Sequence, residues 1–357
     1  MANPAAPPGP ARLLAERAAA QLLSGPPAAT AEAVAGRLLA IQGQDPRGAR
    51  LAIRARSTGL TAADVDQALT VRRTLVTGWL NRGTLHLVCS ADYWPLHQLT
   101  TPPLHTGCFR RLGQEGIQPD QADRGVAVIE RALRVDGPLT RAQLGERLDA
   151  AGLRTAGQAL VYLLFLAGLR GVSVRGPMAG PEQAYVLARD WLGAPPALDR
   201  DAALGWLAGR YLAGHGPATD RDLAKWSGLP LGDVRHGLAS TAAGLAERSD
   251  GLVSLAPGRS SGPAELPPPR LLGAFDPVLH GWQSRAPVLG QHERAIVQGG
   301  MFRPFAMVRG RAVGTWGLPG GRVVLTELED LAATDRAGLA ADAADVTRFL
   351  SLPRLPG

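Results

Sequence analysis

Two glutamines separated by one glycine form the segment of this chain best suited to chemistry. Gln42 and Gln44 follow the apolar run Leu38-Leu39-Ala40-Ile41 and precede Asp45-Pro46. Each carboxamide offers a carbonyl acceptor and an NH2 group with two donors, so the pair could converge on one water molecule. Taken alone, a Gln-x-Gln pair is more often two solvated glutamines at the end of a surface helix. Gln42 and Gln44 are therefore catalytic candidates that depend on support from the rest of the chain.

The residue beside this pair, Asp45, has an acidic side chain that could act as a base. Its position directly before a proline is more typical of a carboxylate that caps a helix, because proline favours the first helical position. We therefore expect Asp45 to cap or to be solvated.

The composition favours a globular protein with a phosphate-rich partner. Of the 357 residues 45% are hydrophobic, and 38 Lys plus Arg against 31 Asp plus Glu give a formal charge of +7. Lys225 is the single lysine, so nearly all of the positive charge is guanidinium, which pairs bidentately with phosphate. A GC-rich genome would explain the arginine excess equally well.

Cysteine content and motif searches exclude several classes of site. Cys89 and Cys108 are too few for a disulfide framework, a four-cysteine zinc site or an iron–sulfur cluster. The chain has no P-loop and no H-E-x-x-H. Its longest uncharged apolar stretch, Ala159–Leu169, is too short to span a membrane and indicates a buried helix. We expect a cytoplasmic, nucleoid-associated protein with no metal, no cofactor, no membrane contact and no signal peptide.

The elements that must position these residues begin with helices and end with strands. Helical periodicity covers Ala11–Leu23, Thr30–Ile41 and Thr61 through Leu80, so the glutamine pair would lie at the end of the second helix. Alternation over Gly83–Cys89 then indicates a strand. Later segments predict strands or a helical tail: Gly171–Val174, Ala184–Leu187, Leu252–Leu255, Ile296–Gln298, Phe305–Val308, Ala312–Trp316, Arg322–Leu325 and the tail Leu328–Leu350.

An internal sequence repeat gives the clearest indication of the domain organisation. Gly137-Pro138-Leu139-Thr140 and Gly216-Pro217-Ala218-Thr219 share a Gly-Pro-x-Thr-x-x-x-Leu frame. In both copies the threonine could cap the next helix, with support from Gln143 or Asp222 three residues on. Helices are expected before and after each copy, at Gly125–Val135 and Gln158–Leu169, and at Ala202–Ala213 and Leu231–Leu238.

These elements predict a mainly α-helical fold with small β elements, made of three tandem winged helix-turn-helix units, a C-terminal β-rich element and a helical tail. Residues 1–108 would form the first unit with the Gln-x-Gln motif, 109–198 the second and 199–257 the third. A proline-rich linker, Pro257–Pro269, leads into a closing region over 258–357. Trp79, Trp94, Trp206 and Trp226 are expected in the cores.

Four segments in one order carry a resemblance to a known family. They are Ile41-Gln42-Gly43-Gln44, Arg82-Gly83-Thr84-Leu85-His86, Phe275-Asp276-Pro277 with Arg285, and Gly310-Arg311-Ala312-Val313-Gly314-Thr315-Trp316. Together they resemble the AlkZ-type winged-helix DNA glycosylases over most of the chain. The resemblance implies monomeric, monofunctional excision of N7-alkylated purines from double-stranded DNA. In antibiotic producers it implies removal or unhooking of bulky adducts or crosslinks that the cell's own genotoxin makes.

The resemblance also implies site residues. The family's catalytic motif is two glutamines around an apolar residue, which Gln42 and Gln44 match, although Gly43 replaces the usual packed side chain and adds backbone freedom. DNA-binding or pocket residues would be Asn81, Arg82, Thr84, His86, Asp276, His280, Arg285, Arg309 and Arg311. Arg294 and Arg303 would extend the phosphate-facing surface. Local ordering competes with function at His86, and for Asp276 and His280 a role in ordering the loop is favoured.

Two other functions fit the same elements. A non-catalytic winged-helix DNA-binding protein, such as a regulator or lesion-binding protector, would tolerate alanine at Gln42 and Gln44. A hydrolase or sequestering protein that acts on the free genotoxin would work without DNA and with little salt dependence.

Overall fold

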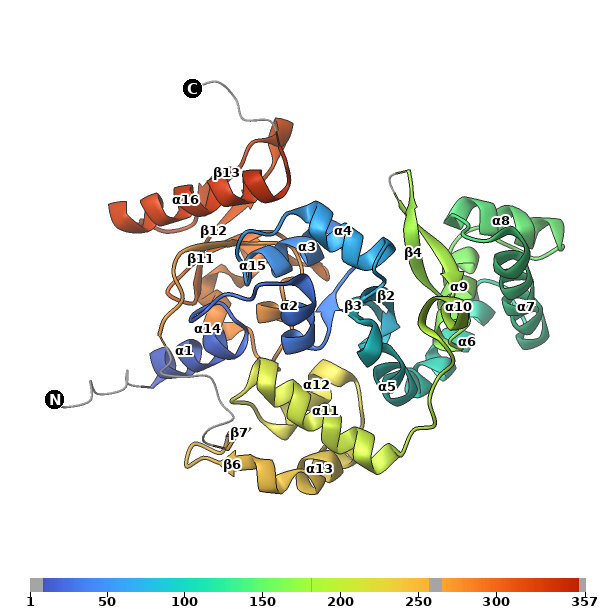
Figure 1. Cartoon of the computed structure of the whole chain (residues 1–357), viewed down its shortest axis with the longest axis horizontal. Helices are drawn as coiled ribbons and strands as arrows, with labels where there is room; N and C mark the ends of the chain where they lie inside the picture. The colour runs from blue at the N-terminus through green and yellow to red at the C-terminus, as the bar shows by residue number, and fades with distance from the viewer. Residues whose placement is uncertain (1–8, 181, 257–264, 353–357) are drawn as a thin grey trace. The chain divides into compact units, whose positions relative to one another are not determined.

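The computed structural model of the chain describes residues 9–180, 182–256 and 265–352. The chain forms two compact units, whose elements are labelled in Figure 1. Unit 1 contains Met1–Val65, Leu204–Trp226 and Pro230–Gly357, and unit 2 contains Asp66–Ala203 with Ser227–Leu229. Helices hold 53% of the residues and strands 18%, which confirms the mainly α-helical fold with small β elements. The division into four domains stays a prediction, and residues 257–264 of its linker lie outside the described part.

Unit 2 is built on four antiparallel strands in the order β3-β2-β4-β5. β2 (Leu75–Leu80) pairs with β3 (Thr84–Cys89) over its whole length, and β4 (Ser173–Ala179) pairs with β5 (Glu182–Leu187) as expected for a wing. The predicted buried helix is α9 (Ala159–Leu169), which packs on two other helices of the unit. The remaining helices are α5 (Ser90–Thr100), α6 (His105–Gln114), α7 (Pro119–Asp136), α8 (Arg141–Ala150) and α10 (Ala188–Leu192).

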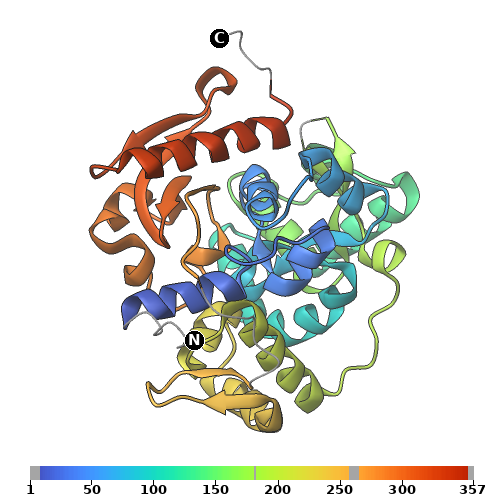
Figure 2. The same ribbon diagram turned by 60° about the vertical axis from the view of Figure 1, so that its left-hand side comes forward.

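Unit 1 contains a second sheet in the order β13-β12-β11-β8, with every pair antiparallel. The long C-terminal helix α16 (Ala333–Phe349) packs on β8 (Arg270–Leu272), and Figure 2 shows it crossing the strands. The turn between β11 and β12 uses positive φ at Arg309 (48°) and Gly310 (78°), the conformation of tight hairpins. The other strands are β11 (Phe305–Val308), β12 (Arg311–Gly317) and β13 (Val324–Glu327).

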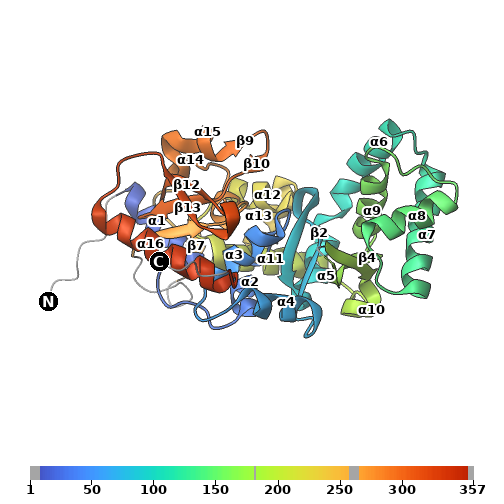
Figure 3. The same cartoon turned by 90° about the horizontal axis from the view of Figure 1, so that it is seen from above.

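Shorter elements complete unit 1, several of which are visible from above in Figure 3. α14 (Ala286–Leu289) packs on both β12 and the N-terminal helix α1 (Pro10–Ala20). The predicted strand Ile296–Gln298 is shorter than expected, because Ile296 ends a helical turn and only Val297–Gln298 is extended. These elements are α13 (Leu231–Ser240), α15 (Glu293–Ile296), β6 (Leu245–Glu247), β7 (Val253–Leu255), β9 (Val297–Gln298) and β10 (Met301–Phe302).

Two of the predicted N-terminal helices have wrong boundaries. α2 spans Ala31–Leu38, and Leu39 turns the chain with φ of 64°, so the expected continuation to Ile41 is wrong. The stretch Thr61 through Leu80 is a helix only over α4 (Ala62–Thr70), because Arg73 (φ 54°) breaks it and β2 follows. An unpredicted helix, α3 (Pro46–Arg54), begins directly after the glutamine pair. These differences move the glutamines from a helix end to a strand-to-helix segment.

The two Gly-Pro-x-Thr copies fold as the sequence predicts. Thr140 and Gln143 exchange hydrogen bonds in a capping box that begins α8. Thr219 and Asp222 exchange the same pair of bonds at the start of α12 (Asp220–Ser227), which follows α11 (Arg200–His215). In each copy the residue before the threonine pairs with a wing strand, Leu139 with Tyr185 and Ala218 with Val253. That shared geometry agrees with winged-helix units, whose tandem arrangement remains a prediction.

Candidate functional site

The glutamine pair spans the end of a short strand and the turn that leads into a helix. Gln42 ends β1 (Ile41–Gln42) and is 8% exposed, whereas Gln44, two residues later, is exposed. Asp45 is the N-cap of α3, and its Oδ1 accepts a hydrogen bond from the Arg47 amide at 3.0 Å. This cap confirms the helix-capping interpretation of Asp45. Gln44 directly precedes the N-cap of α3. The N-terminus of a helix carries a partial positive charge, which can orient the uncharged carbonyl of a nearby glutamine.

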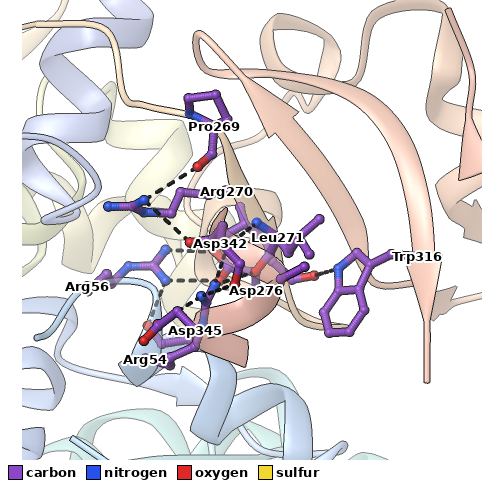
Figure 4. A network of polar contacts seen from close by, with 12 residues as sticks. Arg54, Arg56, Pro269, Arg270, Leu271, Asp276, Trp316, Asp342 and Asp345 are labelled. Carbon is purple, nitrogen blue, oxygen red and sulfur yellow. Dashed lines mark hydrogen bonds and ion pairs between the residues drawn. The ribbon is translucent and has the colours of Figure 1, made fainter. Parts of the chain in front are cut away.

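Two buried arginines, Arg54 and Arg56, anchor the other end of α3. Arg54 donates to the Leu271 carbonyl at 2.7 Å and to Asp342 Oδ2 at 2.9 Å, which attaches α3 to β8 and α16. A second carboxylate, Asp345, lies 3.2 Å from the same guanidinium. Figure 4 shows these acidic and basic side chains together beside the strands. The helix that follows the glutamines is therefore tied to the C-terminal part of the chain.

The second arginine forms a bidentate ion pair with one of the predicted site residues. Arg56 donates to both carboxylate oxygens of Asp276, at 2.7 and 2.9 Å, and neither side chain has any exposed surface. Asp276 Oδ1 also caps η4 (Pro277–Leu279) by accepting from the Val278 amide. Both carboxylate oxygens of Asp276 are thus engaged and buried. This geometry favours the loop-ordering role expected for Asp276.

His280 lies in an aromatic cluster with Phe275 and Phe302. Its ring is 4.5 Å from that of Phe302 and stacks on Phe275 at 6.0 Å with 14° between the planes. Arg285 places its guanidinium 5.0 Å from the Phe302 ring centre and donates to the Leu279 carbonyl. These contacts fix the half-buried Arg285 at the edge of the cluster. The cluster orders the segment that follows Asp276.

Two further arginines predicted to bind DNA, Arg309 and Arg311, lie at the β11–β12 hairpin. Arg309 is exposed in the turn and forms an ion pair of 2.7 Å with Asp335 of α16. Arg311 is exposed at the start of β12. Exposed arginines can still exchange a surface partner for a phosphate, since such pairs contribute little to stability. Their contact with DNA stays a prediction.

Unit 2 holds the other four predicted residues, Asn81, Arg82, Thr84 and His86, on the β2–β3 hairpin. Asn81 lies in η1 (Asn81–Gly83) and is fully buried, and neither polar atom of its amide has a hydrogen-bond partner among the described residues. Arg82 has φ of 57°, and Thr84 Oγ1 donates to the Asn81 carbonyl at 3.2 Å. His86 is 2% exposed and hydrogen-bonds the Thr84 carbonyl through Nδ1.

The electrostatics of the hairpin keep its histidine neutral. Burial, together with the nearby Arg82 charge, lowers the pKa of His86 to about 3. A neutral imidazole in this position is a local hydrogen-bonding group and not a phosphate-binding cation. The local-ordering interpretation of His86 therefore gains support, while its contact with DNA is untested.

Comparison with known proteins assigns this arrangement to a family. The family model described as DNA glycosylase AlkZ-like matches residues 35–349, which include every predicted site residue. The chain belongs to the AlkZ-like DNA glycosylase family. It is accordingly a DNA glycosylase that acts on DNA, and the resemblance found in the four sequence segments is confirmed.

A solved structure of the family supports the same assignment. DNA glycosylase AlkZ of Streptomyces sahachiroi matches this structure with a TM-score of 0.77 and 25% sequence identity. The match covers 97% of this chain and 98% of that chain. No curated protein matches the chain in sequence.

Sequence reasoning missed two buried arginines near the C-terminal end of α3, Arg54 and Arg56. Their signal was present as an Arg-x-Arg pair directly after the apolar run Leu51–Ile53, where unpaired buried charges would be costly. Their partners could not be found in the same way, because Asp276 and Asp342 lie 220 and 288 residues away.

The described part of the chain contains neither a candidate metal site nor a candidate membrane span. No group of three or more His, Cys, Asp or Glu in residues 9–180, 182–256 and 265–352 is arranged to hold a metal ion. No helix in those ranges has the length and apolar character to cross a membrane. The arrangement suits positioning of water and charge stabilisation.

Proposed function

We propose that this DNA glycosylase hydrolyses the N-glycosidic bond of cationic N7-alkylguanine, with Gln42 and Gln44 as the catalytic residues. Bulky adducts or crosslinks made by a genotoxin are the proposed natural lesions, which would make the protein a self-resistance repair enzyme. It would act as a monomer on alkylated double-stranded DNA in the cytoplasm, at the nucleoid.

The chemistry of the lesion explains why two neutral side chains suffice. Alkylation at N7 makes guanine a cation, so the base can leave without protonation by a general acid. The transition state then resembles a sugar oxocarbenium ion, and the enzyme must place a water at C1′ and orient dipoles toward the developing charge. Two glutamine carbonyls can do both. An unmodified base, which needs protonation to leave, would gain little from them.

The observation that carries the proposal is the placement of the pair. Gln42 is buried and Gln44 exposed, and α3, which begins two residues after Gln44, is capped by Asp45, while Arg56, just beyond its C-terminal end, is held by Asp276. Catalysis by orientation needs such a rigid support, because a carboxamide that is misplaced by about 1 Å loses on the order of 10²-fold in rate.

A lyase step is not part of the proposal. A bifunctional glycosylase needs an amine nucleophile that forms a Schiff base with the sugar. The chain has one lysine, Lys225, which is exposed on α12 and lies far along the chain from the glutamines. We expect abasic DNA as product, with strand cleavage only after added base.

The decisive experiment is single-turnover excision of N7-methylguanine and of a bulky N7-alkylguanine from a duplex. Wild type should exceed spontaneous depurination, Gln42→Ala and Gln44→Ala should each lose about 10²-fold in rate, and all should bind the duplex with similar affinity. Gln67→Ala is the matched control, since Gln67 is an exposed glutamine of α4 that belongs to none of the predicted site segments.

Two results would overturn the proposal. Wild type that binds the duplex but never exceeds spontaneous base loss on either lesion would favour the non-catalytic DNA-binding protein. Destruction of the free alkylating agent without DNA, insensitive to salt, would favour a small-molecule hydrolase, because no phosphates would be neutralised.

A further inference from the structure

The loop before and through Asp276 runs beside α3 and contacts it near both ends. A Cβ on Gly48 would collide with the Ala274 carbonyl oxygen, and one on Gly273 would lie 2.9 Å from Gly48 Cα. Backbone therefore meets backbone in the first turn of α3, four residues after Gln44. At the other end the same loop contributes Asp276 to the ion pair with Arg56. The orientation of α3, and of the segment that leads into it, is thus set against this loop.

The Arg56 guanidinium has all of its donors directed at fixed acceptors. Besides the two Asp276 oxygens, it donates to Gln21 Oε1, the Gln21 carbonyl and the Ala52 carbonyl, each at 2.9 Å. A planar fork with five satisfied bonds permits one orientation of the side chain. The loop residue Phe275 is held at φ 59°, a conformation that a bulky residue rarely adopts. The strained residue thus lies directly after Gly273 and Ala274, the loop residues that contact α3.

A buried ion pair is a poor means of gaining stability, since apolar residues of the same volume often serve as well. Its advantage is geometric, because a bidentate pair specifies direction and an apolar contact does not. The other bridge on α3, Arg54–Asp342, provides a natural comparison. It is also buried, at 2.9 Å, but Asp342 lies on α16 and accepts from the Leu271 amide of β8, so this bridge attaches α3 to α16 and β8 and not to residues 273–276 of the loop.

We propose that Asp276, acting through Arg56, is a positioning residue that orients α3 and thereby the Gln42–Gln44 pair. The proposal rests on the proposed catalytic role of the two glutamines. It assigns to the Asp276 loop a part in setting the excision rate, beyond the stability that any buried bridge provides.

The test compares Asp276→Asn with Asp342→Asn, which each neutralise one carboxylate paired with an arginine at or just after the C-terminal end of α3. For each variant we would measure the single-turnover excision rate at saturating enzyme, the half-saturating enzyme concentration and the urea midpoint of unfolding. Asp276→Asn should lower the rate about 10-fold or more with unchanged half-saturation. Asp342→Asn should lower the urea midpoint comparably and leave the rate within about 2-fold. Equal effects of the two variants on rate, or no effect of Asp276→Asn, would overturn the proposal.

Two additions keep the outcome decisive. If Asp276→Asn fails to fold, Asp276→Glu keeps the charge but displaces the fork by one methylene, and a wild-type rate in that variant would overturn the proposal. Side-chain amide NMR signals of Gln42 and Gln44, assigned with the two alanine variants, should shift in Asp276→Asn and not in Asp342→Asn. A wild-type protein without excision activity overturns the proposed function, whereas active wild type with unaffected Asp276 variants overturns only this inference.

Discussion

The two Gly-Pro-x-Thr copies have the same local structure in different surroundings. Thr140 with Gln143 and Thr219 with Asp222 make matching capping boxes, and each copy pairs with a wing strand. Gln143 is exposed in unit 2, and its capping box stabilises the start of α8. Asp222 is 6% exposed in unit 1 and has further partners. A short sequence frame therefore determines the helix start, but not what depends on it.

The second copy connects its helix to the segment that carries the site. Asp222 lies 3.7 Å from the Arg17 guanidinium and accepts a bond of 2.8 Å from the Gln283 amide. Arg17 in turn covers the Trp282 ring at 4.4 Å. Because Gln283 follows η4 closely, Asp222 helps to hold the region that contains Asp276 and His280. The first copy has no comparable contact among the described residues around Gln143.

The largest expected difference in stability between the copies comes from the residue three positions after the capping threonine, which is Gln143 in the first copy and Asp222 in the second. Asp222→Ala should cost about 3 kcal/mol of unfolding free energy, since it leaves Arg17 without its carboxylate and the Gln283 amide without an acceptor. Gln143→Ala should cost about 0.5 kcal/mol, as for an exposed side chain with one capping bond. Urea unfolding at constant slope measures both. Similar costs for the two variants would mean that the tertiary contacts of Asp222 contribute nothing.

The residue directly before each copy, Asp136 or His215, should make the stability of the two regions depend differently on pH. His215 is fully buried beside Tyr211, and burial lowers its pKa to about 3, whereas the equivalent Asp136 is exposed in an ion pair with Arg147. The unfolded chain binds a proton at His215 below pH 6.5 and the folded chain does not, so this stability is complete above pH 6.5 and is lost as the pH falls. The loss should reach about 2 kcal/mol at pH 5.

Unfolding free energies between pH 7 and 5 would show this effect. His215→Asn keeps a donor for the Tyr211 carbonyl, which His215 Nδ1 contacts at 3.2 Å, and should flatten the pH dependence. His86 is present in both proteins and cancels. Asp136→Asn is the control and should leave the curve nearly parallel to wild type. If His215→Asn also runs parallel to wild type, the histidine is not the source of the acid sensitivity.

The smallest difference is expected at the capping threonines. Thr140→Ala and Thr219→Ala each remove one bond to the amide three residues on, and each should cost about 1 kcal/mol. The two costs should agree within about 0.5 kcal/mol because the bond is local in both copies. Thermal or urea unfolding measures them, and a gap of several kcal/mol would show that the boxes are not equivalent.

Local patterns made much of the fold and the motif predictable. The capping boxes, the wing strands β4 and β5, the buried helix α9 and the β11–β12 hairpin all depend on interactions within a few residues. The glutamine pair was singled out by residue type and spacing together with the family resemblance, and its catalytic role stays a prediction. Its setting was mispredicted, because the apolar run before Gln42 suits a helix and a strand equally, and positive φ at Leu39 ended the helix early.

The sequence by itself determined where helices begin, which residues carry amides and charge, and which family the motifs resemble. Only the tertiary structure decided that Arg56 meets Asp276 across 220 residues of chain and that Asp222 serves three partners while Gln143 serves one helix. The physical reason is the distance along the chain over which each interaction acts. A capping bond closes over three residues and is encoded by them, whereas a buried ion pair exists only when folding removes water from both partners.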